Sequence, residues 1–284
     1  MISIIICSRE STINVDLAEN IKKTVGCKYE LIIVDNSENQ YSIFEAYNVG
    51  IEKSASPYLC FLHDDIKIHS IGWGNTIICY FKENQKIGLI GVAGSKIKTK
   101  MPSAWWEHDT KFLVKYIIQH YPDKKPILES LGFANTNTEE VVIIDGVFMA
   151  IRKDDHIRFE ENLTGFHNYD QSISLNVRNL GYKVIVTKEI LIEHFSPGNV
   201  DETWIGSTLQ FHQLYKDKLP QSVEGKVTRR DEAKSCLSFI NNCRYTWHKR
   251  TSFKFWIRYF VLNPFSNQNK FFLKYYIKAA YKRK

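Results

Sequence analysis

Short apolar runs alternate with amphipathic segments along the first 65 residues of the chain. The apolar runs at residues 3–7, 30–34 and 58–62 predict buried strands. The segments at residues 15–25 and 43–53 space their apolar residues every three or four positions, which predicts helices packed through one face. Continuous apolar strands that alternate with helices predict a mostly parallel sheet covered on both faces.

The pattern continues less regularly to about residue 200. We expect three more strands, at residues 87–93, 141–151 and 183–186. One more helix is expected at residues 170–179. A long irregular segment between the first two of these strands carries Trp105 and Trp106, and such segments typically form functional loops or small subdomains. The expected fold is α/β: a single Rossmann-like, mostly parallel mixed sheet flanked by helices.

The remainder of the chain reads as a helical extension. Residues 201–217 have helical spacing, residues 218–235 form a polar connector, and helical spacing returns from Phe253. A row of lysines then recurs at every fourth residue, at Lys270, Lys274, Lys278 and Lys282. We therefore divide the chain into an α/β domain at residues 1–200, for which a catalytic role is argued below, and a helical, basic and aromatic extension at residues 201–284.

Charge separates the two parts. From Lys234 to the end the chain has 12 Lys and Arg and no Asp or Glu, which leaves 26 basic and 31 acidic residues before that point. Basic amphipathic helices with aromatic residues suit an anionic membrane surface. The alternative is that these helices pack on the catalytic domain and hold their lysines in solvent. Nucleic acid is not an expected partner, because no segment resembles a nucleic-acid-binding module.

Cysteine usage and hydropathy indicate the compartment. The six cysteines form no C-x-x-C pair and several lie in apolar runs, so we expect buried, reduced thiols in a cytoplasmic protein. The first residues lack the charged start and apolar length of a signal peptide, and no apolar run reaches about 18 residues. Any membrane contact is therefore expected to be peripheral, at the inner face of the cell membrane.

Polar residues follow three successive predicted strands. Ser8 and Arg9 follow the first strand, Asp35 ends the second, and His63-Asp64-Asp65 follows the third. Ligands of open α/β sheets bind at the carboxyl ends of the strands, and carboxylates are the usual protein ligands of Mg²⁺. Each residue alone is more often a turn residue or a helix cap. Their coincidence at one edge predicts a site.

Four stretches of the chain resemble the family 2 glycosyltransferases and their relatives with the A-type nucleotide-sugar fold. These are residues 3–9, 32–37 (IIVDNS), 47–50 (YNVG) and 58–66, which ends in HDDI. The resemblance implies that Ser8, Arg9, Asp35, Asn48 and Asp64 bind a nucleotide-sugar donor, which we expect to be a UDP-sugar. It also implies that Asp65 binds Mn²⁺ or Mg²⁺. His63 replaces an Asp of the usual motif and is interpreted as a packing residue.

Later segments extend the resemblance to about residue 200. It implies that Gly146 leaves room beside the donor sugar, that Asp170 is the general base and that His194 contacts the metal or the diphosphate. An inverting transfer needs such a base because the acceptor hydroxyl is a poor nucleophile until it loses its proton. The family often has Glu-Asp where this chain has Tyr169-Asp170. For Asp170 the structural alternative is a carboxylate that stabilises the start of its helix.

These observations predict a metal-dependent, inverting glycosyltransferase that moves a sugar from a nucleotide diphosphate to a glycan hydroxyl in surface polysaccharide synthesis. Trp105 and Trp106 are candidates for the acceptor side, where aromatic faces suit sugar rings. A non-catalytic sugar-nucleotide-binding protein of a membrane glycan assembly complex is the alternative. A nucleotidyltransferase is disfavoured, because the usual Gly-rich, basic loop does not follow the first strand.

Overall fold

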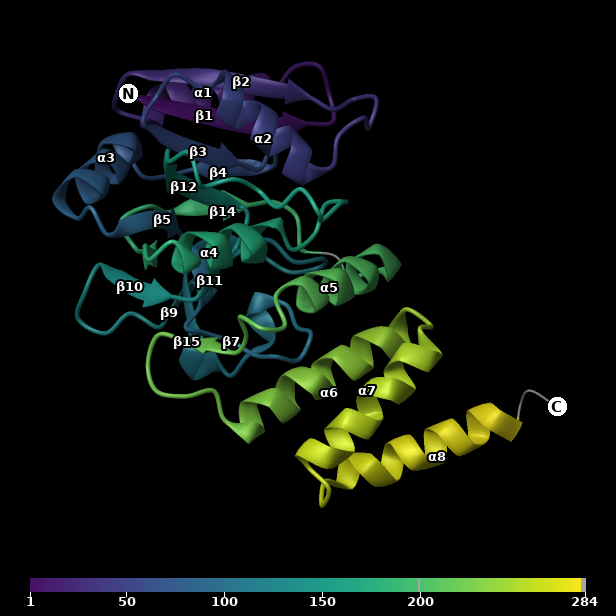
Figure 1. Ribbon diagram of the computed structural model, residues 1–284. Helices are drawn as coiled ribbons and strands as arrows, with labels where there is room; N and C mark the ends of the chain where they lie inside the picture. The colour runs from purple at the N-terminus through teal and green to yellow at the C-terminus, as the bar shows by residue number, and fades with distance from the viewer. Residues whose placement is uncertain (199, 282–284) are drawn as a thin grey trace.

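The main sheet of the protein has seven strands in the order β10-β13-β5-β12-β3-β1-β2 (Figure 1). The computed structural model describes residues 1–198 and 200–281. Five strands run parallel, and β12 and β10 run against them. The strands are β1 (Ile2–Ser8), β2 (Tyr29–Asp35), β3 (Tyr58–Leu62), β5 (Ile87–Gly91), β10 (Thr138–Val141), β12 (Phe148–Arg152) and β13 (Lys183–Thr187).

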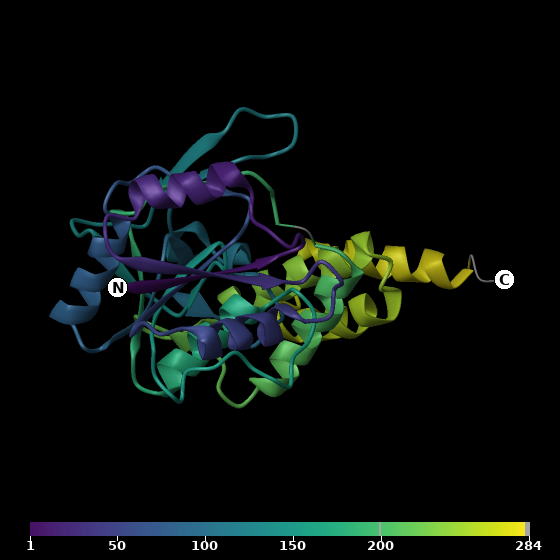
Figure 2. The ribbon, with the colours of Figure 1, turned by 90° about the horizontal axis from the view of Figure 1, so that it is seen from above.

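Helices cover both faces of this sheet, as predicted from the apolar strands. Ile4 and Ile6 of β1 pack against α1 (Val15–Thr24) and α3 (Trp73–Glu83), whereas Ile5 faces α2 (Ile43–Lys53) and α4 (Tyr169–Asn179). Figure 2 shows α1 and α2 on opposite sides of the strands. The α/β class and the mostly parallel sheet are thus confirmed. Helix α3 was not predicted.

Local capping explains where the first helices begin. The side chain of Asn14 accepts a hydrogen bond from the backbone of Asp16 and so starts α1. Ser42 and Glu45 form a reciprocal capping box at the start of α2. A Cβ on Gly26 would lie 2.6 Å from the Cα of Gly72, so the close approach of these two loops requires glycine.

A second sheet lies beside the first and was not expected. Its path is β11-β6-β8-β14-β4, with β9 also paired to β8, and the short strands β7 (Ile97–Lys98) and β15 (Gln221–Ser222) form a separate pair. Its strands are β4 (Ile66–Ile68), β6 (Ala93–Ser95), β8 (Leu113–Gln119), β9 (Ile127–Leu131), β11 (Ile143–Ile144) and β14 (Ile192–His194). The irregular segment around Trp105 therefore belongs to a small subdomain.

The expected strand at residues 141–151 is divided between the two sheets. The Asp145 side chain accepts a hydrogen bond from the backbone of Val147 at 2.8 Å, which turns the chain between β11 and β12. Asp145-Gly146 interrupts the apolar run at this turn, and both short strands beside it are buried.

The C-terminal part consists of α5 (Glu202–Leu214), α6 (Arg229–Tyr245), α7 (Lys249–Leu262) and α8 (Asn267–Tyr281) (Figure 1). Helix α5 contributes to two hydrophobic cores: Phe211 packs in the core that includes α2 and α4, and Trp204 packs with α6. The domain boundary at residue 200 stays a prediction. No helix in the described part of the chain has both the length and the apolar character to cross a membrane. Lys282 of the predicted lysine row lies outside the described residues.

The cysteines differ in part from the prediction. All six are free thiols, and Cys60, Cys236 and Cys243 are buried. Cys79 is exposed on α3, where its thiol contacts Glu83.

Candidate active site

The polar residues that end or follow β1, β2 and β3 lie at one edge of the main sheet, as predicted. Ser8 lies directly opposite Asp35 in the register of β1 and β2. The Ser8 hydroxyl accepts a hydrogen bond from the backbone of Glu10, and the exposed Asp35 carboxylate accepts one from the backbone of Ser37 at 2.9 Å. That backbone donor lowers the pKa of Asp35, which keeps the carboxylate ionised. Arg9 is exposed beside this edge.

Two predicted donor-binding residues, Asn48 and Gly146, have structural partners within the protein. Asn48 is buried, and its amide both donates to the carbonyl of Phe159 and accepts from the N–H of the same residue. Gly146 lies against the ring of Tyr169: a Cβ at this position would be 2.2 Å from the Tyr169 hydroxyl oxygen. The space beside Gly146 is therefore filled by a side chain of the protein.

Three side chains converge near the end of β3. Asp65 Oδ1 lies 3.7 Å from His63 Nδ1 and 3.6 Å from His194 Nε2. The three ligand atoms lie within 4.8 Å of one another, a separation that one metal ion can bridge. Pairing of β4 with β14 produces this convergence, because His194 lies opposite Ile66, the residue after Asp65. Asp64 is not part of this group and faces a neighbouring depression on the surface with α1.

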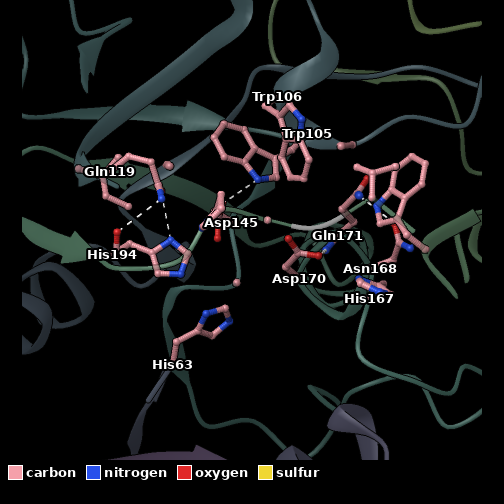
Figure 3. A pocket seen from close by; sticks show the side chains of 18 of the residues that line it. His63, Trp105, Trp106, Gln119, Asp145, His167, Asn168, Asp170, Gln171 and His194 are labelled. Atoms are coloured by element: carbon pink, nitrogen blue, oxygen red, sulfur yellow. Dashed lines mark hydrogen bonds between the residues drawn. The ribbon is translucent and has the colours of Figure 1, made fainter. Parts of the chain in front are cut away.

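His194 has the orientation of a metal ligand. Its Nδ1 lies 3.1 Å from the Oε1 of Gln119, and since that oxygen can only accept, Nδ1 carries the proton (Figure 3). Its Nε2 is buried and has no hydrogen-bond partner. Nε2 therefore carries no proton, and its lone pair is free to bind a metal ion on the side of Asp65. In metal-binding histidines a hydrogen bond from the other ring nitrogen typically fixes this tautomer.

His63, interpreted from the sequence as a packing residue, is a further candidate ligand beside Asp65. Its Nε2 lies 2.6 Å from the hydroxyl of Tyr169, which leaves Nδ1 directed at Asp65. Burial, together with the nearby His194, lowers the pKa of His63 and favours the neutral ring.

Asp170 lies at the start of α4. The side chain of Asn168, the residue before the helix, accepts from Gln171 and donates to Ser207 and Thr208 of α5, so α5 fixes this end of α4. Burial and the neighbouring Asp145 carboxylate raise the pKa of Asp170 to about 7. A carboxylate with a pKa near neutrality can accept a proton and release it again.

One cleft of about 420 Å³ joins these groups (Figure 3). His63, His194, Asp145 and Asp170 line it, so the two histidine candidates for metal binding and the proposed base are open to the same space. Asp65 lines the neighbouring depression together with Asp64. Trp105 also lines the cleft and donates its indole N–H to Asp145 at 2.9 Å. The arrangement can hold a cation at one end of a cleft and accept a proton further along it.

The aromatic wall of this cleft is the short helix of Trp105, Trp106 and Glu107. Trp105 is buried and Trp106 is 39% exposed, with the rings packed edge to face. Glu107 accepts from Ser238 and from the amide of Asn242 at 2.5 and 2.7 Å, and its other oxygen accepts from the backbone of Ala104. Helix α6 therefore holds the wall in place.

Comparison with known proteins agrees with this geometry. The model of the Glycosyltransferase like family matches residues 3–223. The chain belongs to this family. No curated protein sequence matches this glycosyltransferase. The predicted resemblance and the predicted enzyme class are thereby confirmed.

Solved structures with a similar fold include GalNAc-T7 with UDP, GalNAc and Mn²⁺, at 9% identity and a TM-score of 0.50 over 74% of this chain and 47% of that chain. This chain thus spans about half the length of the GalNAc-T7 chain. S. aureus TarS 1–349 in complex with UDP-GlcNAc is similar at 13% identity and a TM-score of 0.44, covering 96% of this chain and 75% of that one. A197 from STIV has 11% identity and a TM-score of 0.41 over 69% and 86% of the two chains.

Three contributors to the glycosyltransferase cleft were not found from the sequence. Gln119 orients His194 from β8. Asp145 adds to the effect of burial in raising the pKa of Asp170, and it accepts a hydrogen bond from Trp105. Glu107 joins the aromatic wall to α6. Gln119 and Glu107 have no local motif, whereas Asp145, followed by Gly146 inside an apolar run, was a visible signal of a turn.

Proposed function

We propose that this glycosyltransferase moves a sugar from a UDP-sugar to a glycan hydroxyl, with inversion and with dependence on Mn²⁺ or Mg²⁺. The observation that carries the proposal is that Asp170, with a pKa near 7, opens into the same cleft as His63 and His194. The fold shared with GalNAc-T7, whose structure holds UDP, GalNAc and Mn²⁺, supports the choice of donor and cation.

The residues present fit a divalent cation. Asp65, His194 and His63 offer one carboxylate and two imidazole ligands, and the buried, unpartnered Nε2 of His194 is costly unless it has a ligand. When bound, the cation neutralises charge that develops on the departing nucleoside diphosphate. Gln119 fixes the His194 tautomer that such a cation requires.

The other predicted residues divide between donor and acceptor. Ser8, Arg9 and Asp35 lie at the strand edge where we propose that the nucleoside binds, with Asp64 toward the phosphates. Asp170 takes the proton from the acceptor hydroxyl as that oxygen attacks the anomeric carbon. Its half-buried position disfavours the charged form, so the carboxylate is a stronger base than an exposed aspartate.

We place the acceptor beside Trp105 and Trp106, whose faces suit the C–H faces of a sugar ring. The acceptor is a glycan or lipid-linked glycan of surface polysaccharide synthesis. The reaction then takes place in the cytoplasm, at the inner face of the cell membrane. This location follows from the basic, aromatic helices at the C-terminus.

Calorimetric titration with UDP, with and without Mn²⁺, tests the donor site. We expect metal-dependent binding that Asp65→Ala weakens by at least about 100-fold. Asp155→Ala, an exposed aspartate away from the cleft, is the matched control and should bind like wild type. Absence of binding to UDP and to every other nucleoside diphosphate would contradict the proposal.

A non-catalytic sugar-nucleotide-binding protein is the second candidate. It is favoured by one observation, that Tyr169 fills the space beside Gly146 and binds His63. Metal-dependent hydrolysis of UDP-sugars separates the two candidates. An enzyme should hydrolyse at least one donor slowly and lose that activity in Asp170→Asn, whereas a binding protein should hydrolyse none.

A further inference from the structure

Helices α7 and α8 each bury one face and leave the other uncovered. Phe255, Tyr259 and Phe272 pack with α6 in a separate hydrophobic core. Apolar side chains also lie in solvent on both helices and on the turn between them: Phe253, Ile257, Phe260, Val261, Phe265, Phe271, Leu273 and Ile277. Soluble monomers rarely expose so many large apolar side chains together.

The centre of this surface is a groove between α7 and α8. Its volume is about 630 Å³, and its lining includes Trp256, Ile257, Phe260 and Leu273. Phe265 stands at the edge of the groove on the α7–α8 turn and is 97% exposed. An apolar face of this kind needs a partner that is itself apolar.

The charge around the groove limits the kind of partner. From Lys249 to Lys278 the chain has seven Lys and Arg and no Asp or Glu, whereas residues 1–233 carry a net negative charge. Lys270 lines the groove, and Lys274 follows one turn later on α8, exposed. An apolar face on a segment that has basic and no acidic residues complements a surface that has negative headgroups over an apolar interior.

The surface is held in one shape by contacts with the rest of the protein. The guanidinium of Arg229, at the start of α6, donates to the carbonyls of Val261 and Leu262 at the end of α7. The guanidinium of Arg244 lies over the rings of Phe271 and Tyr275 on α8, at 4.8 and 4.4 Å from their centroids. The apolar face is therefore presented without a folding step.

We propose that the outer face of α7 and α8, with Phe265 at its tip, docks the protein on an anionic lipid surface. Figure 2 shows these helices extending past the edge of the sheet opposite the N-terminus, the edge where β1 ends. Docking therefore brings the lipid surface to the side of the molecule where the strands end. The proposal deepens the proposed function by naming the surface that binds the membrane. It rests on the proposed function in one respect, that a lipid-linked acceptor is present in that membrane.

Co-sedimentation of the full chain with vesicles tests the apolar contribution. We expect binding to vesicles of phosphatidylcholine mixed with phosphatidylglycerol and little binding to phosphatidylcholine alone. Phe260→Ser combined with Phe265→Ser should weaken binding by on the order of 100-fold, because two phenylalanines no longer enter the interface. Ile71→Ser combined with Leu128→Ser removes two exposed apolar residues from the catalytic part and should bind like wild type.

A second pair of variants tests the charge. Lys270→Glu combined with Lys274→Glu should weaken binding by at least about 30-fold, since each basic residue near the surface adds to the attraction. Lys22→Glu combined with Lys53→Glu makes the same change in net charge on the catalytic part and should leave binding unchanged. Equal losses in both pairs would mean that net charge alone attracts the protein, and would overturn the proposal.

Other occupants of the surface have separate outcomes. Dimerisation in light scattering that the two Phe→Ser changes abolish, without vesicle binding, would assign the face to a second copy of the chain. Salt-sensitive binding to single-stranded RNA without vesicle binding would assign it to nucleic acid. UDP titration of the same variants should match wild type, so failure of docking and failure of the donor site are distinguishable.

Discussion

Replacing Asp170 by Asn is expected to raise the stability of the protein at alkaline pH while slowing transfer. Burial and the Asp145 carboxylate raise the pKa of Asp170 from 3.8 to about 7 in the folded protein. Below about pH 4 the group is protonated in both the folded and unfolded states and has no effect. Between about pH 4 and pH 7 only the unfolded state loses the proton, so wild-type stability falls as the pH rises.

The size of the effect follows from the shift. Each unit of pKa difference corresponds to about 1.4 kcal/mol, so the full change from 3.8 to about 7 corresponds to about 4 kcal/mol above pH 7. Because part of the Asp170 side chain faces solvent, screening reduces the expected value to between about 2 and 4 kcal/mol. Asparagine has no proton to lose, and its amide oxygen can still accept the N–H of Gln171.

Urea unfolding of wild type and Asp170→Asn at about pH 5 and about pH 8 measures this difference. We expect the variant to be more stable by about 2 to 4 kcal/mol at the higher pH, with a smaller gain at the lower pH. Asp155→Asn, on the surface, should change neither value. The same Asp170→Asn variant should bind UDP normally but transfer sugar about 10² to 10⁴ times more slowly, and wild-type kcat/KM should fall tenfold per pH unit below about pH 7.

Equal unfolding free energies of wild type and Asp170→Asn at about pH 8 would refute the reasoning. So would a wild-type pH–rate profile that is flat between about pH 5 and pH 8. The first result would mean that Asp170 is ionised at little cost in the folded protein. The second would mean that the residue does not act as the base.

Three further substitutions test the positions with structural partners. Asn48→Ala should lower the free energy of unfolding by about 2 to 3 kcal/mol, because both amide atoms bond the buried backbone of Phe159, and a changed Kd for UDP would contradict this role. Gly146→Ala should destabilise the fold by about 1 to 3 kcal/mol in urea unfolding, since the added carbon meets the Tyr169 hydroxyl; unchanged stability would contradict the overlap. Glu107→Gln should lower Tm by about 2 to 8 °C, because it weakens the bond to α6 by about 1 to 2 kcal/mol; an unchanged Tm would mean that the bond does not support the fold.

The sequence was sufficient to predict the main sheet because its strands are apolar on both faces. Ile4, Ile5 and Ile6 are all buried, which is the pattern of a strand covered by two layers of helices. The second sheet could not be predicted in the same way. Strand β9 has four of its five residues exposed, and β6 has the sequence Ala93-Gly94-Ser95, so neither has a periodic apolar signal.

The residues of the candidate site that lie at the ends of strands were predictable from the sequence. Asp65 and His194 both end or follow strands, and the structure brings them to within 3.6 Å. The role of His63 was missed because it depends on Tyr169, which is 106 positions away and fixes one ring nitrogen. A residue type at one position does not reveal which of its atoms is free, and this depends on contacts made by distant parts of the chain.

Contacts between distant parts of the chain also connect the C-terminal helices to the candidate site. The Glycosyltransferase like family match ends at residue 223, before α6 begins. Yet Glu107, next to the two tryptophans of the cleft, is bonded to Ser238 and Asn242, 131 and 135 positions further along. Ala104, at the start of the aromatic helix, packs in the core that α6, α7 and α8 form. A lipid surface bound by α7 and α8 would therefore act on helices that are in contact with the aromatic wall of the cleft.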